Sequence, residues 1–203
     1  MKLKSLLAVF AVAAMMTVVG CNDNDTKIES QRTTIERFLT SSHQPRLIAE
    51  SDVPNSIEYN PPFYEKLSQD IYRYVATYYD EDRDLREEVE MGDMVELTFT
   101  AYIFNGSQPS LKMVYYTNEA SIISSLSAEG LNTQYWVAEP LVLNLGESNI
   151  IKGVERSLLG CREGDKVEVY MTYEAAYDKD AVGVIEKETS VAWIYTIDKV
   201  VKR

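Results

Sequence analysis

Residues 140–177 read PLVLNLGESNIIKGVERSLLGCREGDKVEVYMTYEAAY, and this stretch decides the fold. Leucine occupies every second position over 141–145, which predicts a half-buried strand. Residues 152–159 predict one or two helical turns, and 162–165 (REGD) have the composition of a turn. Apolar residues alternate again over 166–172, which predicts a second strand. One face of the helix should carry Ile151, Val154, Leu158 and Cys161.

The order of short motifs along the chain resembles FKBP-type peptidyl-prolyl isomerases. The matching pieces are Gly92-Asp93, Leu145-Gly146, Ile150-Ile151, Lys152-Gly153, Gly164-Asp165, Ala176-Tyr177 and Gly183-Val184-Ile185. The resemblance runs from Ile71 to the end of the chain. It implies an α+β fold, in which a bent antiparallel β-sheet of five or six strands wraps around one short helix. An N-terminal helix and a long insertion should be added to this core.

The first 20 residues predict a lipoprotein signal peptide. Lys2 and Lys4 precede an apolar run that is too short to span a membrane with confidence, since about 20 apolar residues are needed. Small residues then precede Cys21, which resembles the bacterial cysteine that is acylated and becomes the new N-terminus. The alternative is an ordinary signal peptide with a chance cysteine. We expect lipidation at Cys21 and a membrane-anchored protein of the cell envelope, in the outer membrane, on its periplasmic or its outer surface.

Charge and composition exclude several classes of function. The formal net charge of the 203 residues is −12, and it becomes −14 without the two lysines of the signal peptide. Such an acidic surface repels nucleic acid, so no nucleic-acid partner is expected. The single histidine, His43, and two cysteines are too few for a zinc site or a histidine-based triad. Asp80, Asp82 and Asp84 have calcium-loop spacing, but required positions are not filled, so neither a metal nor a cofactor is predicted.

The chain divides into three parts. After the signal peptide, residues 21–62 should hold a flexible tether, an N-terminal helix over 28–41 and a proline-rich linker. Residues 63–203 should form the FKBP-like domain, with strands predicted over 71–79 and 94–104. In the second of these, Val95, Leu97, Phe99 and Ala101 should face the core.

An insertion over about 107–139 matches no pattern of the family. It predicts a helix over 118–127, and it either covers the pocket or adds a binding surface. Its aromatic residues are Tyr115, Tyr116, Tyr135 and Trp136.

The resemblance also implies a pocket for a proline ring. Tyr177, Trp193 and Phe99 would fall at catalytic positions, and the surrounding wall would be Ile150, Ile151, Val154, Leu141 and Ile185. Several positions depart from the family: a tyrosine is Phe99, the tryptophan of the pocket floor is Val154, and an aromatic–Asp pair falls near Pro109-Ser110. Ile150, Ile151 and Val154 are equally compatible with a plain core.

Two functions fit these residues. The first is a peptidyl-prolyl cis-trans isomerase with a degenerate pocket and weak activity, which assists the folding of proline-containing polypeptide clients. Such catalysis needs an apolar concavity that favours a twisted amide, and neither a nucleophile nor a metal. The second is a non-catalytic binding module that uses its insertion to contact a protein or glycan partner.

Overall fold

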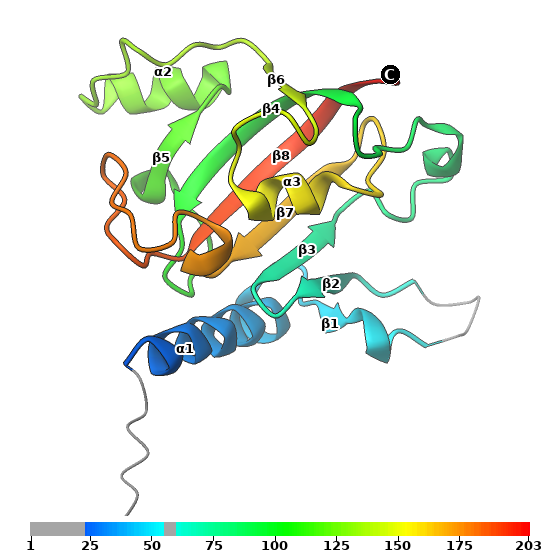
Figure 1. Ribbon diagram of the computed structural model, residues 1–203, viewed down its shortest axis with the longest axis horizontal. Coiled ribbons are helices and arrows are strands. Elements are labelled where there is room, and N and C mark those ends of the chain that lie inside the picture. The colour runs from blue at the N-terminus through cyan, green and yellow to red at the C-terminus, as the bar shows by residue number, and fades with distance from the viewer. Residues whose placement is uncertain (1–22, 55–59) are drawn as a thin grey trace, which may run out of the picture.

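The computed structural model describes residues 23–54 and 60–203. Their strands form one sheet in the order β1-β2-β3-β7-β8-β4-β5, and β6 pairs with β4 beside β5 (Figure 1). All neighbours are antiparallel except β1 and β2. The strands are β1 (Ile48–Ala49), β2 (Phe63–Ser68), β3 (Ile71–Val75), β4 (Met94–Ile103), β5 (Val114–Thr117), β6 (Leu141–Asn144), β7 (Lys166–Met171) and β8 (Val191–Val201).

Three α-helices accompany the sheet in the described ranges: α1 (Asp23–Arg37), α2 (Ala120–Ala128) and α3 (Lys152–Leu158). α1 continues into a π-helical turn, Phe38–Ser42. Short 3-10 turns lie at Glu50–Asp52, Arg83–Leu85, Leu111–Met113 and Tyr173–Ala175. The predicted helices over 28–41 and 118–127 are confirmed, but the predicted tether is wrong from Asp23 onward. Asp25, in the first turn, favours a helix start here, because a negative side chain complements the positive end of the helix dipole.

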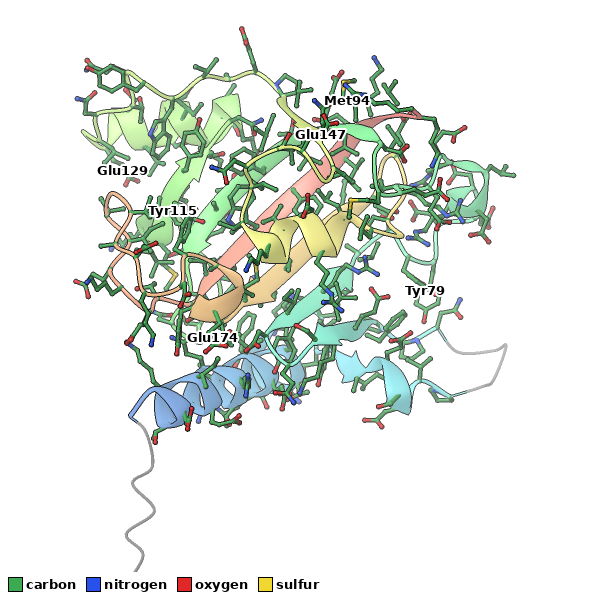
Figure 2. All side chains as sticks on the ribbon, in the orientation of Figure 1. Tyr79, Met94, Tyr115, Glu129, Glu147 and Glu174 are labelled. Atoms are coloured by element: carbon green, nitrogen blue, oxygen red, sulfur yellow. The ribbon has the colours of Figure 1, made fainter. Side chains whose placement is uncertain are left out.

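The inner face of the sheet holds the main core. β4 and β8 pair along their whole length, and Val95, Leu97, Phe99 and Ala101 are buried, as the alternation predicted. α3 packs against this face through Val154 and Leu158, and Cys161 follows in the turn after the helix; all three are fully buried. The predicted helix inside a wrapped antiparallel sheet is therefore confirmed. Figure 2 labels Met94 at the start of β4 and Glu147 just after β6, where these two strands pair.

The opposite face of the sheet is covered by the N-terminal segment. Ile35, Phe38 and Leu39 form a second core with tyrosines of β3 and β7. β1 then joins the edge of the sheet by pairing with β2. The sheet thus has eight strands in the described residues where five or six were expected, because part of the proline-rich linker pairs as β1 and residues 63–68 add β2. The strand predicted over 71–79 ends at Val75, since residues 75–80 form successive turns.

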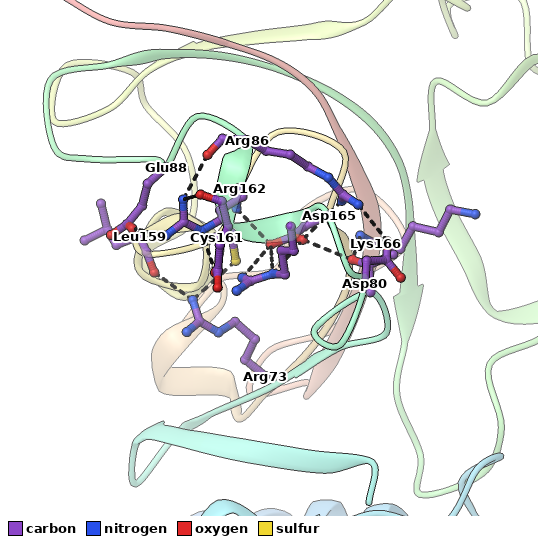
Figure 3. A network of polar contacts seen from close by, with 12 residues as sticks. Arg73, Asp80, Arg86, Glu88, Leu159, Cys161, Arg162, Asp165 and Lys166 are labelled. Carbon is purple, nitrogen blue, oxygen red and sulfur yellow. Dashed lines mark hydrogen bonds and ion pairs between the residues drawn. The ribbon is translucent and has the colours of Figure 1, made fainter. Parts of the chain in front are cut away.

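Arg73 on β3 joins the sheet to the end of α3 (Figure 3). One guanidinium nitrogen donates to the carbonyl oxygens of Ser157 at 2.9 Å and Leu159 at 2.7 Å. These are carbonyls of the last helical turn, which has no further intrahelical donors. The other nitrogens donate to the carboxylate of Glu65 at 2.5 and 2.8 Å. Arg73 is buried, so its charge is stabilised only by these partners.

Replacing Arg73 by Met should lower the free energy of unfolding by about 3–5 kcal/mol, because Glu65 and the helix carbonyls lose their buried partner. Urea denaturation measures this loss. Lys199→Met is the matched control, because Lys199 forms an exposed pair with Glu96 at 3.7 Å, and such pairs contribute about 1 kcal/mol or less. Equal losses in the two variants would contradict the role given to Arg73.

His43 fastens the N-terminal segment to the sheet. The ring is fully buried, with Nδ1 2.5 Å from the carbonyl oxygen of Pro45 and Nε2 3.0 Å from the carboxylate of Glu168. Two acceptors require a proton on each nitrogen, so this geometry fits the charged imidazolium. Burial lowers the pKa of His43, but the hydrogen bonds to Glu168 and Pro45 and the charge of Glu168 raise it above its ordinary value.

A raised folded-state pKa means that His43 stabilises the protein fully below its unfolded pKa of about 6.5. The contribution is lost as the pH rises through the folded-state pKa. The free energy of unfolding should therefore fall more steeply from about pH 6 to about pH 9 in the wild type than in His43→Gln. Urea titrations of both proteins across this range test it, and parallel pH curves would contradict it.

Candidate functional site

Four aromatic side chains from different elements meet at one end of the sheet. The rings of Phe99 on β4 and Trp193 on β8 stack, with centroids 4.4 Å apart and planes 7° apart. Trp193 Nε1 donates a hydrogen bond of 2.6 Å to the hydroxyl of Tyr115 on β5. This hydroxyl lies 3.2 Å from that of Tyr177, which follows the Tyr173–Ala175 turn after β7. The two hydrogen bonds therefore join residues that are 62 and 78 positions apart in the chain.

Tyr115 covers Trp193, one of the three residues that were expected at catalytic positions. Phe99 and Trp193 are buried at 2% and 4% exposure, whereas Tyr115 and Tyr177 are half-buried. Figure 2 labels Tyr115 on β5, beside the strand that carries Phe99. The insertion therefore supplies a strand of the sheet and a lid over Trp193. Phe99 and Trp193 form a floor beneath the surface that a ligand would meet.

Two hollows lie on either side of Tyr177 and share Tyr177 and Val182 in their walls. The first, of about 480 Å³, is called the acidic hollow; its other walls include Ile150, Ile151, Lys152, Glu174, Asp178 and Asp180. The second, of about 420 Å³, is called the aromatic hollow; its other walls include Tyr115, Tyr116, Leu131, Trp136, Val184 and Ile185. Volumes of this size are typical of small ligand sites.

A tight turn closes both hollows. Val182 and Ile185 exchange two backbone hydrogen bonds of 3.0 and 2.9 Å, which forces a reversal at the two residues between them. Gly183 takes a φ of +60° there, a conformation that glycine adopts without steric penalty. The turn buries Ile185 and leaves Val182 and Val184 exposed. Apolar surface is therefore offered to solvent beside the aromatic rings.

The hydroxyls of Tyr115 and Tyr177 remain protonated at neutral pH. Burial raises the pKa of Tyr115 far above its ordinary value, and the charge and hydrogen bond of Tyr177 raise it further. Burial also raises the pKa of Tyr177. Trp193 can only donate, so Tyr115 accepts from it and is free to donate to Tyr177. In that arrangement the proton of Tyr177 is available to a carbonyl oxygen that enters either hollow.

The residues expected at the site separate into three groups. Tyr177, Ile150 and Ile151 line the acidic hollow, and Tyr177 with Ile185 lines the aromatic hollow. Val154 is fully buried on the inner side of α3 and Leu141 is half-buried at the start of β6; both pack in the inner core. Trp193 lies beneath Tyr115, and Phe99 packs against the rings of Trp193 and Tyr116; neither Phe99 nor Trp193 lines a hollow.

The model of one protein family, the FKBP-type peptidyl-prolyl cis-trans isomerases, matches residues 86–197, which is more than half of the chain. The chain belongs to this family. Its FKBP-type domain therefore includes β4 to most of β8, with both hollows inside the matched range. No curated protein sequence matches the chain.

Two solved plant structures resemble this FKBP-type chain. One is the N-terminal domain of FKBP42 from Arabidopsis thaliana, at 13% identity and a TM-score of 0.47. It is matched over 98% of its length by 74% of the present chain. The other holds the three FKBP domains of wheat FKBP73, at 17% identity and a TM-score of 0.48. The match covers 67% of the present chain and 48% of the longer wheat chain.

Several site residues were not expected from the sequence. Glu174, Asp178 and Asp180 were not among the expected site residues, although they lie just after β7, next to Tyr177. Tyr115 and Trp136 were expected as parts of an insertion that either covers the pocket or contacts a partner, and both line the aromatic hollow beside Tyr177. The only sequence feature that pointed to Tyr115 and Trp136 was the concentration of aromatic residues in the insertion over 107–139. It could not show which ring points inward.

Tyr115→Phe should lower the free energy of unfolding by about 1–3 kcal/mol, because the buried Trp193 N–H loses its acceptor and Tyr177 loses its hydroxyl partner. Thermal or urea unfolding measures the loss. Tyr116→Phe serves as the control, since Tyr116 is 39% exposed and surface changes stay within about 0.5 kcal/mol. A loss in Tyr115→Phe no larger than in the control would show that this hydrogen-bonded chain adds nothing to stability.

Proposed function

We propose that this FKBP-type chain is a peptidyl-prolyl cis-trans isomerase of the cell envelope that assists the folding of proline-containing polypeptides. The observation that carries the proposal is the position of Tyr177, whose hydroxyl lies where the two hollows meet and whose proton can be offered to a substrate. The aromatic hollow is the apolar seat for the proline ring. Its walls include Tyr115, Tyr116 and Trp136.

Catalysis of this reaction requires only that the protein bind the twisted form of the X-Pro amide more tightly than the planar form. Rotation about an X-Pro bond crosses a barrier of about 18–20 kcal/mol, because the amide loses resonance as it twists. Surfaces that bind the twisted form more tightly than the planar form lower this barrier. Aromatic walls hold the ring, and Tyr177 donates a hydrogen bond to a carbonyl oxygen next to the proline. Neither step uses a metal or a nucleophile.

The coverage of Trp193 by Tyr115 supports weak activity. The expected proline site lay over Trp193, Phe99 and Val154, and Tyr115 now occupies its mouth. The proline ring would therefore rest on Tyr115 and not on Trp193, and fewer side chains would enclose it than in the expected pocket. The same observation favours a second candidate function, a non-catalytic module that uses its insertion to bind a protein or glycan partner.

The proposed location depends on Cys21, which lies outside the described residues. Acylation at this cysteine would anchor the protein to the membrane, and multiple acyl chains give stable attachment. The outer membrane is the proposed site. Within residues 23–54 and 60–203, none of the helices combines the length and the apolar character needed to span a bilayer.

Tyr177→Phe should reduce kcat/KM for a Leu-Pro peptide by about threefold to tenfold, the effect of losing one neutral hydrogen bond in the transition state. NMR exchange spectroscopy on the full chain in mild detergent measures the rate without a protease. Tyr135→Phe is the matched control, because Tyr135 is 80% exposed and lines neither hollow.

Full activity in a folded Tyr177→Phe variant would move the reaction away from this site. No catalysis by the folded wild-type protein would overturn the isomerase proposal. Partner binding that is lost in Trp136→Ala would then support the non-catalytic module, because Trp136 belongs to the insertion and lines the aromatic hollow.

A further inference from the structure

We infer that Gln31 of α1 is a positioning residue, which holds the site loop, residues 178–188, in the place where it forms walls of both hollows. The inference rests on the proposed function, because it assumes that the proline-containing client binds in these hollows. α1 ends at Arg37, whereas the family match begins at residue 86. A helix outside the matched FKBP-type range therefore completes the site.

The side-chain amide of Gln31 makes hydrogen bonds on both sides of the site. Its Nε2 donates to the carbonyl oxygen of Glu188 at 2.9 Å, and its Oε1 accepts from the backbone N–H of Tyr173 at 3.0 Å. Tyr173 precedes Tyr177, and Glu188 ends the site loop, so one amide joins the chain before and after the hollow walls. One turn earlier on the same helix, Lys27 donates to the carboxylate of Glu188 at 2.8 Å.

The site loop has few other contacts that fix its position. The backbone N–H of Glu188 donates to the carbonyl oxygen of Asp178 at 3.1 Å, so the two ends of the loop meet. The N–H of Asp178 donates to the carbonyl oxygen of Tyr173 at 2.7 Å. The described residues 178–188 contain neither a helix nor a strand. The loop therefore depends on these hydrogen bonds, on the buried side chain of Ile185 and on the contacts from α1.

Both ends of the site loop have a backbone conformation that residues other than glycine rarely adopt. Asp178 and Glu188 each have a φ of +54°, in the left-handed region. Such a conformation persists only where the surrounding structure holds it. Gln31 binds the carbonyl oxygen of Glu188 and Lys27 binds its carboxylate. α1 therefore restrains the loop at a residue whose backbone would otherwise relax.

α1 is a firm support for the loop, because the turns that follow Gln31 are packed tightly. Ile35 and Phe38 are fully buried in the second core. Thr34 lies so close to Gly106, just after β4, that a Cβ atom at this glycine would be 2.6 Å from Thr34 Cγ2. Figure 1 shows α1 running beneath the end of the sheet from which the site loop projects. The helix therefore cannot follow the loop if the loop moves.

Loss of the Gln31 contacts should weaken client binding more than it slows the bond rotation. The site loop supplies Val182 to both hollows and Val184 and Ile185 to the aromatic hollow. If the loop holds this position for only part of the time, the apparent affinity falls in proportion to that fraction. A bound client would still meet Tyr177, whose hydroxyl is held by Tyr115. KM should therefore rise while kcat stays nearly constant.

The test is Gln31→Leu, which nearly keeps the size of the side chain and removes both hydrogen bonds of the amide. For a Leu-Pro peptide, KM should rise about threefold to tenfold, the effect of one or two neutral hydrogen bonds, and kcat should stay within about twofold. NMR exchange spectroscopy on the full chain in mild detergent, at a series of peptide concentrations, gives both constants.

Glu36→Leu is the matched control, because Glu36 lies on the same helix and also makes polar contacts to the sheet. It accepts hydrogen bonds from Lys66 at 2.7 Å and from the hydroxyl of Tyr72 at 3.1 Å. These partners belong to β2 and β3 and not to the site loop. The control should therefore keep the wild-type KM even if it loses as much stability as Gln31→Leu.

A second measurement does not depend on catalysis. The backbone N–H groups of Val182, Ile185 and Glu188 donate hydrogen bonds within the site loop. Their hydrogen exchange, followed by NMR, reports how often the loop opens. Exchange at these three amides should be about threefold to tenfold faster in Gln31→Leu than in the wild type, and unchanged in Glu36→Leu.

Lys27→Met provides a further variant, because it removes only a partly exposed ion pair and leaves the core intact. It should raise KM by about twofold, as expected for an exposed pair. An unchanged KM in this variant would overturn the inference even if Gln31→Leu did not fold.

The remaining outcomes separate the two proposals. An unchanged KM in folded Gln31→Leu, or amide exchange no faster than in the control, would overturn the inference while the proposed function stands. Absence of catalysis by the folded wild-type protein, together with faster exchange in Gln31→Leu, would overturn the proposed function and support the positioning of the site loop by Gln31.

Discussion

Arg73 reaches from β3 across the inner core to the end of α3, where it donates to the carbonyl oxygens of Ser157 and Leu159. A helix of seven residues is too short to be stable alone, so α3 depends on such tertiary contacts. The residues just before this helix, Ile150 and Ile151, form a wall of the acidic hollow. The position of that wall therefore depends on a buried charge at the other end of the helix.

A second constraint acts on the turn between α3 and β7. The carboxylate of Asp165 is fully buried and accepts hydrogen bonds from Arg83 at 2.7 and 3.0 Å and from the hydroxyl of Thr77 at 3.0 Å. It also accepts from the backbone N–H of Arg162. Together with Arg73, this network ties the C-terminal end of α3 and the turn before β7 to β3 and to the β3–β4 connection. The walls of the two hollows come mainly from loops at the other end of the sheet, where a substitution disturbs the core least.

Much of the core followed from the sequence because alternation and helical spacing report burial directly. Val95, Leu97 and Phe99 face inward as the period of two required, and Val154 and Leu158 lie on the inner side of α3. Periodicity fails where both faces of a strand are covered. All five residues of β3 are buried, since α1 covers its outer face, so the pattern could not mark Arg73 as an inward charge.

The site was less predictable for a related reason. Motif order placed Tyr177, Ile150 and Ile151 around one concavity, and all three line the acidic hollow. It could not place Tyr115, because the direction of that side chain depends on the register of β5 against β4, which shifts between Ala101 and Tyr102. A one-residue change of register sends a side chain to the opposite face. Short strands with such irregularities leave no readable period in the sequence.

The lengths of the outermost strands have a consequence for behaviour at high local concentration. An exposed sheet edge is a template on which other extended chains can add as further strands. Here one edge ends in β1, of two residues, and the other in β5, of four residues with an irregular register. A protein that gathers unfolded polypeptides at its surface would be especially exposed to such strand addition. The short outermost strands therefore limit the addition of further strands to this sheet.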